Sequence, residues 1–166
     1  MYREIADFIE DWSHESEATV KIFKIIPEDK KGLKINSHIR SLERLAWHIT
    51  QTVTEMPFKS GLLEEDGLEN QPIPKTIDEI INIYKEQSEL ICKAVKKKWT
   101  DDDLDEEIEM YGFKWSKGKV LSILVRHQTH HRAQMTILLR QIGVKVPGIY
   151  GPAQEEWVEY GMPAME

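Results

Sequence analysis

Four long segments of the chain repeat apolar residues every three to four positions, which is the period of an α-helix with one buried face. The segments run from about residues 2 to 26, 37 to 56, 76 to 99 and 117 to 142. Amphipathic helices of similar length bury their apolar stripes by packing against one another. The sequence therefore predicts an all-α protein, a four-helix bundle, in one domain that spans residues 1–166.

Local signals mark the ends of the predicted helices. Asn36 or Ser37 is the expected N-cap of the second helix, and Pro57 is expected to stop that helix. Thr76 and Glu79 have the spacing of a capping box at the start of the third helix. The fourth helix is expected to begin after a serine cap and to end at a glycine, Ser116 and Gly143.

The connections between the helices carry three further predictions. Residues 58–75 are long for a structureless connection, so they are interpreted either as a crossover along the bundle or as a functional lid. Residues 108–115 are expected to form a short extended pair around Gly112, and residues 153–160 a short terminal helix.

An acidic stretch precedes the expected extended pair. Asp101, Asp103 and Asp105 have the spacing that begins a calcium-binding loop. Glu106 stands where such a loop needs a glycine, and Gly112 stands where it needs a bidentate glutamate. We therefore interpret the stretch as a solvated connector and not as a calcium site.

The composition excludes several classes of protein. Lys and Arg total 22 and Asp and Glu total 29, so the net charge is −7, which disfavours binding to nucleic acid. No run approaches the roughly 18 apolar residues of a membrane span, and the first residues are polar, so we expect a cytoplasmic protein with no membrane partner. The single cysteine, Cys92, excludes an intrachain disulfide and a cysteine-based zinc cluster, and we expect it to be a packing residue.

Polar residues interrupt each apolar stripe near the middle of its helix. Because packed helices of similar length align their midpoints, we expect these residues to converge in one polar layer inside the bundle. Buried polar groups without partners cost about 1–3 kcal/mol each, so such a layer needs water, a ligand or a metal. The residues are Ser16, Thr19, His48, Ser88, His127 and His131.

The histidines of this layer have the spacing of metal ligands. His127 and His131 are four residues apart on one helix face, and His48 comes from the second helix. Three neutral imidazoles suit Zn²⁺, Ni²⁺ or Fe²⁺ and leave coordination positions open for water or substrate. The alternative is a layer of hydrogen-bonded histidines without a metal, and spacing alone does not decide between the two.

Two sequence motifs carry a resemblance to a known family. Residues 126–134 (RHQTHHRAQ), followed by Leu139-Arg-Gln-Ile-Gly143 and Pro147, resemble the signature H-x-x-H-H-R-G-Q-L, then L-R-x-x-G and a proline, of the DinB-like (DinB/YfiT) family. Residues 45–49 (LAWHI) resemble the histidine segment of its second helix. The chain departs mildly from the pattern at Ala133 and Met135. Segment 148–152 differs more, so substrate specificity carries over poorly.

The resemblance implies a bundle with up-down-down-up connectivity and a divalent metal, often nickel or zinc, held by His48, His127 and His131. It also implies a homodimer and a small-molecule substrate. Relatives include metal-dependent transferases that use low-molecular-weight thiols such as bacillithiol, and a mycothiol-dependent isomerase. We therefore expect a metal-dependent thiol (S-)transferase or hydrolase in which the metal activates a thiol or water. The alternative is a noncatalytic metal-binding protein related to stress.

Residues around the histidines complete the predicted site. Gln134 is expected either to hydrogen-bond bound water or substrate, or to belong to a polar network that holds the helix. Three further residues are expected to lie around the histidines or to line the pocket: Ser16, Thr19 and Ser88. No general base is identified. Arg132 is expected to point elsewhere and to pair with an acidic helix.

Other charged side chains are assigned to the surface. Glu15 and Glu17 are expected outside the core face of the first helix. His130 is expected at the surface or behind a metal ligand, and His14 and His38 are expected to be solvated.

The fourth helix is apolar over more than one stripe. This wide face is interpreted either as a dimer interface or as a surface covered by the long loop. Its residues are Val120, Leu121, Ile123, Leu124, Val125 and Ile137.

Overall fold

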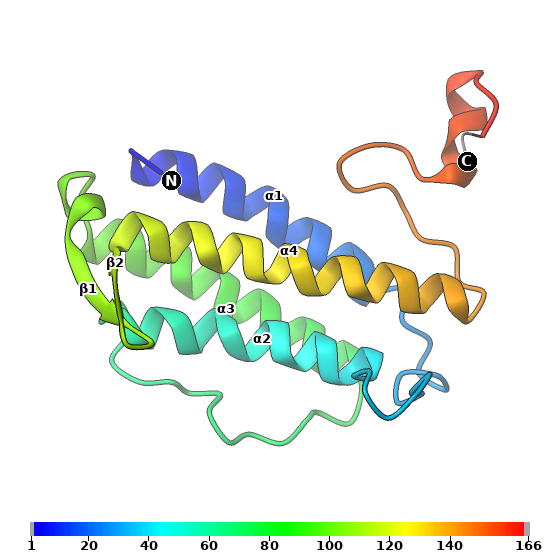
Figure 1. Ribbon diagram of the computed structural model, residues 1–166, viewed down its shortest axis with the longest axis horizontal. Helices are drawn as coiled ribbons and strands as arrows, with labels where there is room; N and C mark the ends of the chain where they lie inside the picture. The colour runs from blue at the N-terminus through cyan, green and yellow to red at the C-terminus, as the bar shows by residue number, and fades with distance from the viewer. Residues whose placement is uncertain (1, 165–166) are drawn as a thin grey trace.

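The protein is a bundle of four long helices, seen in a computed structural model that describes residues 2–164 (Figure 1). A short two-stranded hairpin separates the third helix from the fourth, and a 3-10 turn follows each of these two helices. The elements are α1 (Ile5–Phe23), α2 (Leu42–Lys59), α3 (Ile77–Lys98), η1 (Asp102–Asp105), β1 (Glu107–Met110), β2 (Phe113–Ser116), α4 (Lys117–Gln141) and η2 (Gln154–Tyr160). The predicted all-α bundle is confirmed.

The four helices run up, down, down and up. Helices α1 and α2 each pack against both α3 and α4, so α1 and α2 are diagonally opposed. The backbone N–H of Ile5, at the start of α1, donates to Asp101 just after α3, and Glu28, just after α1, accepts from Ile77 at the start of α3. Therefore α1 and α3 are antiparallel, while Figure 1 shows α2 parallel to α3 and α4 parallel to α1. This order confirms the predicted connectivity.

Parallel α2 and α3 require a connection that runs the length of the bundle, and residues 60–76 provide it. Side chains at successive turns of the outer face of α2 anchor this connection. Trp47 Nε1 donates to the Gln71 carbonyl (3.2 Å), Gln51 Nε2 to the Leu68 carbonyl (3.1 Å) and Thr54 Oγ1 to the Asp66 carboxylate (2.6 Å). Of the two interpretations of this segment, a crossover along the bundle or a functional lid, the structure shows the crossover.

Helix α2 begins and ends later than predicted. Asn36 Oδ1 accepts from the N–H of His38 and closes a local turn, and it is Ser41 that caps the helix, by accepting from the N–H of Arg44 (3.3 Å). Pro57 lies inside the helix, which continues to Lys59. A proline this close to the C-terminus removes one hydrogen bond without breaking the remaining turn.

The other predicted ends are observed. Thr76 Oγ1 accepts from the Glu79 N–H (3.1 Å), and Glu79 accepts from the Thr76 N–H (3.0 Å), which completes the capping box. Ser116 caps α4, and Gly143 follows that helix at a φ of 82°.

The extended pair around Gly112 is a β-hairpin. Met110 pairs with Phe113, so only Tyr111 and Gly112 form the turn. Both have positive φ, 54° and 81°, as a type I′ turn requires. The Tyr111 hydroxyl donates to Glu55 of α2 (2.8 Å), which ties the hairpin to the bundle.

The acidic connector binds backbone N–H groups and lysine. Asp101 accepts from Ile5, and Asp103 accepts from the N–H of Thr100 (2.6 Å). Lys117 pairs with Asp103 and Glu106. Asp101 and Asp103 of the acidic connector are therefore engaged by neighbouring backbone and side-chain groups of the chain.

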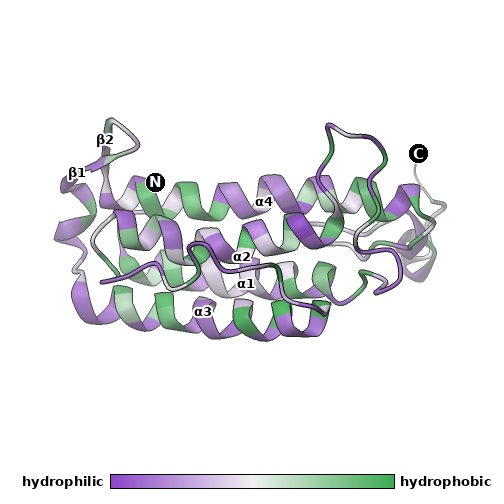
Figure 2. Ribbon diagram, turned by 90° about the horizontal axis from the view of Figure 1, so that it is seen from below, coloured by the Kyte–Doolittle hydropathy of each residue, from purple (hydrophilic) through white to green (hydrophobic). Residues whose placement is uncertain are grey.

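The core contains the apolar stripes of all four helices. Hydrophobic residues recur along each helix with hydrophilic residues between them (Figure 2). Phe8 and Trp12 of α1 and Tyr84 of α3 are at most 1% exposed. Burying an aromatic or aliphatic side chain of this size contributes about 1.5–3 kcal/mol, so the core fixes the spacing of the helices and hence the geometry at mid-bundle.

Candidate metal centre

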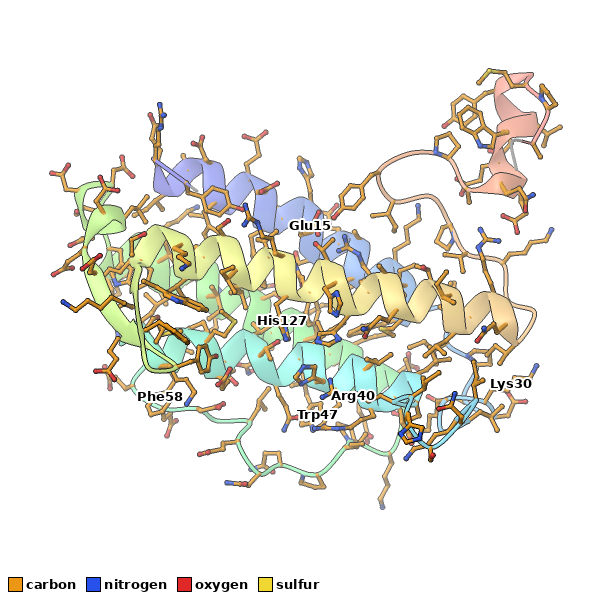
Figure 3. The ribbon with its side chains drawn as sticks, viewed as in Figure 1. Glu15, Lys30, Arg40, Trp47, Phe58 and His127 are labelled. Atoms are coloured by element: carbon orange, nitrogen blue, oxygen red, sulfur yellow. The ribbon has the colours of Figure 1, made fainter. Side chains whose placement is uncertain are left out.

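Three imidazole rings meet between α2 and α4. His48 comes from α2, and His127 and His131 come from successive turns of α4. The Nε2 atom of His131 lies 3.2 Å from Nε2 of His48 and 3.2 Å from Nε2 of His127. Figure 3 shows His127 between the two helices. The structure thus brings together the three histidines that their spacing predicts as metal ligands.

These distances suit one divalent ion. Imidazole nitrogens bind zinc at about 2.0–2.1 Å, so two of them on the same ion are about 3–3.4 Å apart. The candidate ligand atoms all lie within 4.8 Å of one another, and this group of residues contains only histidines. An all-nitrogen set of three ligands is compatible with a divalent metal and leaves positions open for other ligands.

The three rings are held in their neutral form. Burial, followed by the charges of neighbouring histidines and of Arg40, lowers the pKa of His48 to about 3. Burial and the neighbouring histidines likewise lower the pKa of His127 to about 4, and burial lowers the pKa of His131. Neutral imidazoles present a nitrogen lone pair, which is the form that binds metal ions.

Gln134 fixes the orientation of one ring. Its Oε1 lies 2.9 Å from Nδ1 of His131, and its Nε2 lies 3.0 Å from Nε2 of His130. An amide oxygen only accepts, so Nδ1 of His131 carries the proton and Nε2 presents a lone pair toward the other two histidines. Nδ1 of His127, by contrast, is buried without a hydrogen-bond partner among residues 2–164.

Gln134 thus links the exposed His130 to the candidate ligand His131 on the same helix. His14 and His38 are exposed, as expected.

A second buried polar cluster lies on the other side of α4. Arg132 is 2% exposed and Glu15 of α1 is 6% exposed, and their side chains form an ion pair of 2.7 Å. Thr129 and Tyr150 donate to the same carboxylate, at 3.0 Å and 2.6 Å. Arg132 points away from the histidines and pairs with an acidic helix, as predicted.

The prediction that Glu15 lies outside the core was wrong. A carboxylate on the edge of the α1 stripe is buried because Arg132, 117 residues later, neutralises it. Glu17 is exposed, as predicted. The burial of Arg132 and Gln128 was also missed, since both sit beside the histidine stripe on a helix whose second face contacts α1.

The prediction of a single polar layer was likewise wrong. Thr19 is buried, but it contacts Gln128 (3.3 Å) and Arg132 (3.2 Å) and not the histidines. Ser88 is buried on α3, and Ser16 is only half-buried, with its hydroxyl donating to the Ser13 carbonyl. Successive residues of α4 point about 100° apart, so the polar groups form two clusters on two sides of that helix.

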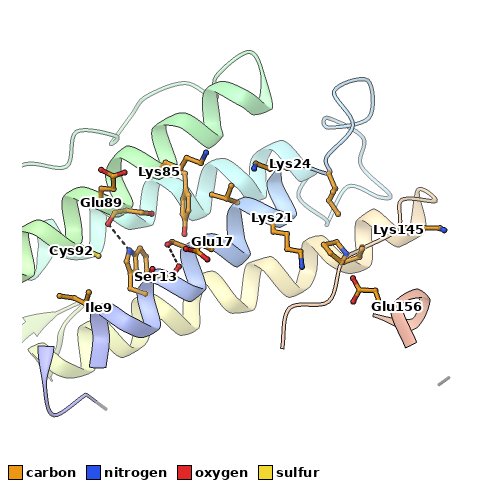
Figure 4. A pocket seen from close by; sticks show the side chains of 18 of the residues that line it. Ile9, Ser13, Glu17, Lys21, Lys24, Lys85, Glu89, Cys92, Lys145 and Glu156 are labelled. Atoms are coloured by element: carbon orange, nitrogen blue, oxygen red, sulfur yellow. Dashed lines mark hydrogen bonds between the residues drawn. The ribbon is translucent and has the colours of Figure 1, made fainter. Parts of the chain in front are cut away.

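A large groove of about 1230 Å³ lies between α1 and α3, away from the histidines (Figure 4). Its floor includes Ile9 and Trp12, and lysines such as Lys21 and Lys85 stand at its rim. Cys92 lines this groove, is half-buried, and has its pKa raised by burial. Burial therefore favours the thiol over the thiolate, which is the nucleophilic form.

The wide apolar face of α4 is partly covered within the chain. Val120, Leu121 and Leu124 are at most 1% exposed, and η1 packs against the same helix. Ile137 remains 58% exposed. Within residues 2–164, each helix lacks the length or the hydropathy needed to cross a bilayer.

Comparison with known proteins agrees with this architecture. The sequence model of the DinB family matches residues 1–162. The Bacillus subtilis (strain 168) protein YrdA, described as uncharacterized, is 35% identical over 164 residues, which cover 99% of this chain and 98% of that protein.

Two solved structures have the same fold. A DinB-like protein from Bacillus cereus ATCC 10987 is 31% identical and superposes with a TM-score of 0.80 over 90% of this chain and 100% of its own. A DinB-like protein from Bacillus subtilis, YjoA, is 18% identical and has a TM-score of 0.69 over 89% of this chain and 99% of its own, which shows the shared fold alone. The family match, the relatives and the three-histidine cluster agree: the chain belongs to the DinB family.

Proposed function

We propose that this protein is a metal-dependent enzyme of the thiol (S-)transferase or hydrolase type, acting on a small-molecule substrate. The observation that carries the proposal is the convergence of three neutral Nε2 atoms, with 3.2 Å contacts, between α2 and α4. His48, His127 and His131 would hold the ion, with Ni²⁺ or Zn²⁺ preferred and Fe²⁺ as an alternative. When bound, such an ion lowers the pKa of a coordinated water or thiol and so provides a nucleophile near pH 7.

The residues near the proposed site indicate whether the nucleophile belongs to the protein or is an external molecule. Gln134 holds His131 in the tautomer whose Nε2 is free, and this positions one of the three ligands. Cys92 lies in the separate α1–α3 groove with a raised pKa, so it does not act as the thiol. The nucleophile of the proposed reaction is therefore water or an external low-molecular-weight thiol.

Metal content tests the proposal directly. Protein purified after supplementation with nickel or zinc is expected to carry about one ion per chain by elemental analysis. His127→Ala is expected to lose the ion, whereas His14→Ala, a change of the same kind at an exposed histidine, is expected to keep it. Stoichiometric metal in His127→Ala would refute the ligand assignment.

Activity separates an enzyme from a noncatalytic metal-binding protein. The metal-loaded protein is screened with thiols plus electrophiles and with simple hydrolysable esters and amides. Turnover that disappears in His127→Ala supports the enzyme, whereas a bound ion with no turnover in either series favours the noncatalytic alternative.

A homodimer is part of the proposal. Ile137 of α4 is 58% exposed, and an apolar residue on a helix is shielded from water when a second copy covers it. Light scattering that gives a mass near 19.4 kDa at micromolar concentration would contradict a stable dimer.

A further inference from the structure

Arg40 stands near the three histidines without a protein partner. It directly precedes Ser41, the N-cap of α2, and its side chain is exposed. It makes no hydrogen bond or ion pair with another residue of the described chain. Its positive charge is one of the causes that lower the pKa of all three histidines. Figure 3 shows it beside α2.

A second arginine is fixed in place beside the same site. Arg44 lies one turn before His48, and its Nη1 donates to Gln51 Oε1 (3.0 Å), one turn after His48. Residues 44, 48 and 51 share one face of α2, so this hydrogen bond lies along the face that carries His48, and the charge of Arg44 also lowers the pKa of His48. Arg44 is half-buried and hydrogen-bonded to Gln51, whereas Arg40 is exposed.

The charge of the site is unbalanced. The group of candidate ligands contains no carboxylate, so a divalent ion held by three neutral imidazoles keeps its full charge of +2. Two arginines add to this charge, in a chain whose net charge is −7. The surroundings therefore attract anions to this one place.

We propose that Arg40, with Arg44 beside it, binds a carboxylate group of the substrate while another donor of the same molecule reaches the metal. The inference rests on the metal-dependent function proposed above and specifies its substrate class: a small anion with a metal-binding thiolate or oxygen and a second, carboxylate group. Arginine suits this role because its planar guanidinium matches both oxygens of a carboxylate.

Cobalt-loaded protein tests the proposal, because thiolate binding to Co²⁺ gives a visible charge-transfer band. Mercaptoacetate, which has a carboxylate, and 2-mercaptoethanol, which has none, are titrated against wild type and Arg40→Ala. The variant is expected to bind mercaptoacetate about three- to fivefold more weakly, as for an exposed ion pair, with 2-mercaptoethanol unchanged. Because each thiol is compared with itself, differences between the thiol pKa values cancel.

Two control variants sharpen the result. Arg40→Lys keeps the charge without the planar fork and is expected to retain part of the preference for mercaptoacetate. Arg3→Ala removes an arginine from a different groove, between α1 and α4, and is expected to change neither affinity. Higher salt is expected to reduce the preference in wild type and to have little effect on Arg40→Ala.

The possible outcomes test the role of Arg40 separately from the proposed metal-dependent function. Equal weakening of both thiols, or unchanged mercaptoacetate affinity in Arg40→Ala, would overturn the role of Arg40 and leave the metal site standing. Cobalt binding without a thiolate band would refute the thiol chemistry. Arg40 is then tested with malonate, which has two carboxylates, against acetate, which has one, because binding of either to cobalt perturbs its d–d bands; equal effects of Arg40→Ala on the two would overturn the role of Arg40. Absence of cobalt from the wild type would overturn both.

Discussion

At the scale of single residues, Gln134 links the surface of α4 to a candidate metal ligand. Its amide oxygen holds Nδ1 of His131 at 2.9 Å, so the ring cannot turn or change tautomer without losing this hydrogen bond. Residues that orient metal-binding histidines typically account for about 10–100-fold in metal affinity. Gln134→Leu is therefore expected to weaken zinc or nickel binding by about that factor, measured by competition with a chromophoric chelator. Gln134→Glu keeps an acceptor and is expected to bind nearly as wild type; equal loss in both variants would contradict the role.

The second prediction concerns the contribution of the buried ion pair Glu15–Arg132 to stability. Arg132→Met leaves a buried carboxylate without its cation, and breaking a buried pair in this way costs about 3–5 kcal/mol. The double variant Glu15→Gln/Arg132→Met removes the charge as well, so it is expected to lose less stability than the two single losses added together. Urea denaturation measures the free energy of unfolding in each variant. Additive losses, within about 0.5 kcal/mol, would show that the two residues are not coupled.

An exposed ion pair on the same helix provides the control. Arg140 pairs with Glu155 at 2.8 Å, with both side chains about one-third exposed. Solvent screens such a pair, so Arg140→Met is expected to cost no more than about 1 kcal/mol.

At the scale of the elements, the capping box at the start of α3 is a local device with a measurable contribution. Thr76 satisfies the N–H of Glu79, and Glu79 satisfies the N–H of Thr76. Thr76→Ala is expected to lower the free energy of unfolding by about 1 kcal/mol, whereas Thr76→Ser keeps the hydroxyl and most of the stability. Equal losses in the two variants, by urea denaturation, would mean that the β-methyl group matters and the cap does not.

Features that depend on neighbours in sequence could be predicted at this scale. Helical periodicity located the four helices, and the turn around Gly112 located the hairpin. The start of α2 was misplaced because several residues before it, Asn36 and Ser37 among them, have side chains that can cap, and a local turn at Asn36 decided between them. A cap depends on which backbone N–H lies within reach, and composition does not determine that.

The two polar clusters differ in the same way: the histidine cluster could be predicted from the sequence, and the cluster around Glu15 could not. His127 and His131 could be selected because they share a helix face and a spacing. Glu15 could not, because a carboxylate at the edge of an apolar stripe is buried only if a cation from a distant segment meets it. Whether Arg132 reaches Glu15 depends on which helices are neighbours in the bundle, and this is a property of the tertiary structure.

At the scale of the whole molecule, the metal-free protein is expected to be sensitive to acid. Folding holds the pKa of His48 at about 3 and that of His127 at about 4, whereas both are near 6.5 in an unfolded chain. Between pH 6.5 and about 4 the unfolded state therefore binds more protons, and the free energy of unfolding falls as the pH falls. Urea denaturation in the presence of a chelator, at steps from pH 7.5 to 5, measures this slope.

The double variant His48→Gln/His127→Gln identifies the source of that slope. Glutamine does not titrate, so the variant is expected to lose much less stability between pH 6.5 and 5 than the wild type does. An unchanged slope would assign the acid sensitivity to other groups.

The position of α4 between two chemically different clusters constrains how the molecule can change. Its consecutive pairs of residues, His127 with Gln128 and His131 with Arg132, face opposite partners: the first of each pair meets His48, and the second meets α1. A turn of the helix about its own axis by one residue would move a guanidinium toward the imidazoles and leave Glu15 buried as an isolated anion. The Glu15–Arg132 ion pair thus fixes the rotation of α4 about its axis and, with it, the direction in which His127 and His131 point. An insertion or deletion of a single residue in the first half of α4 would therefore disable both flanks together.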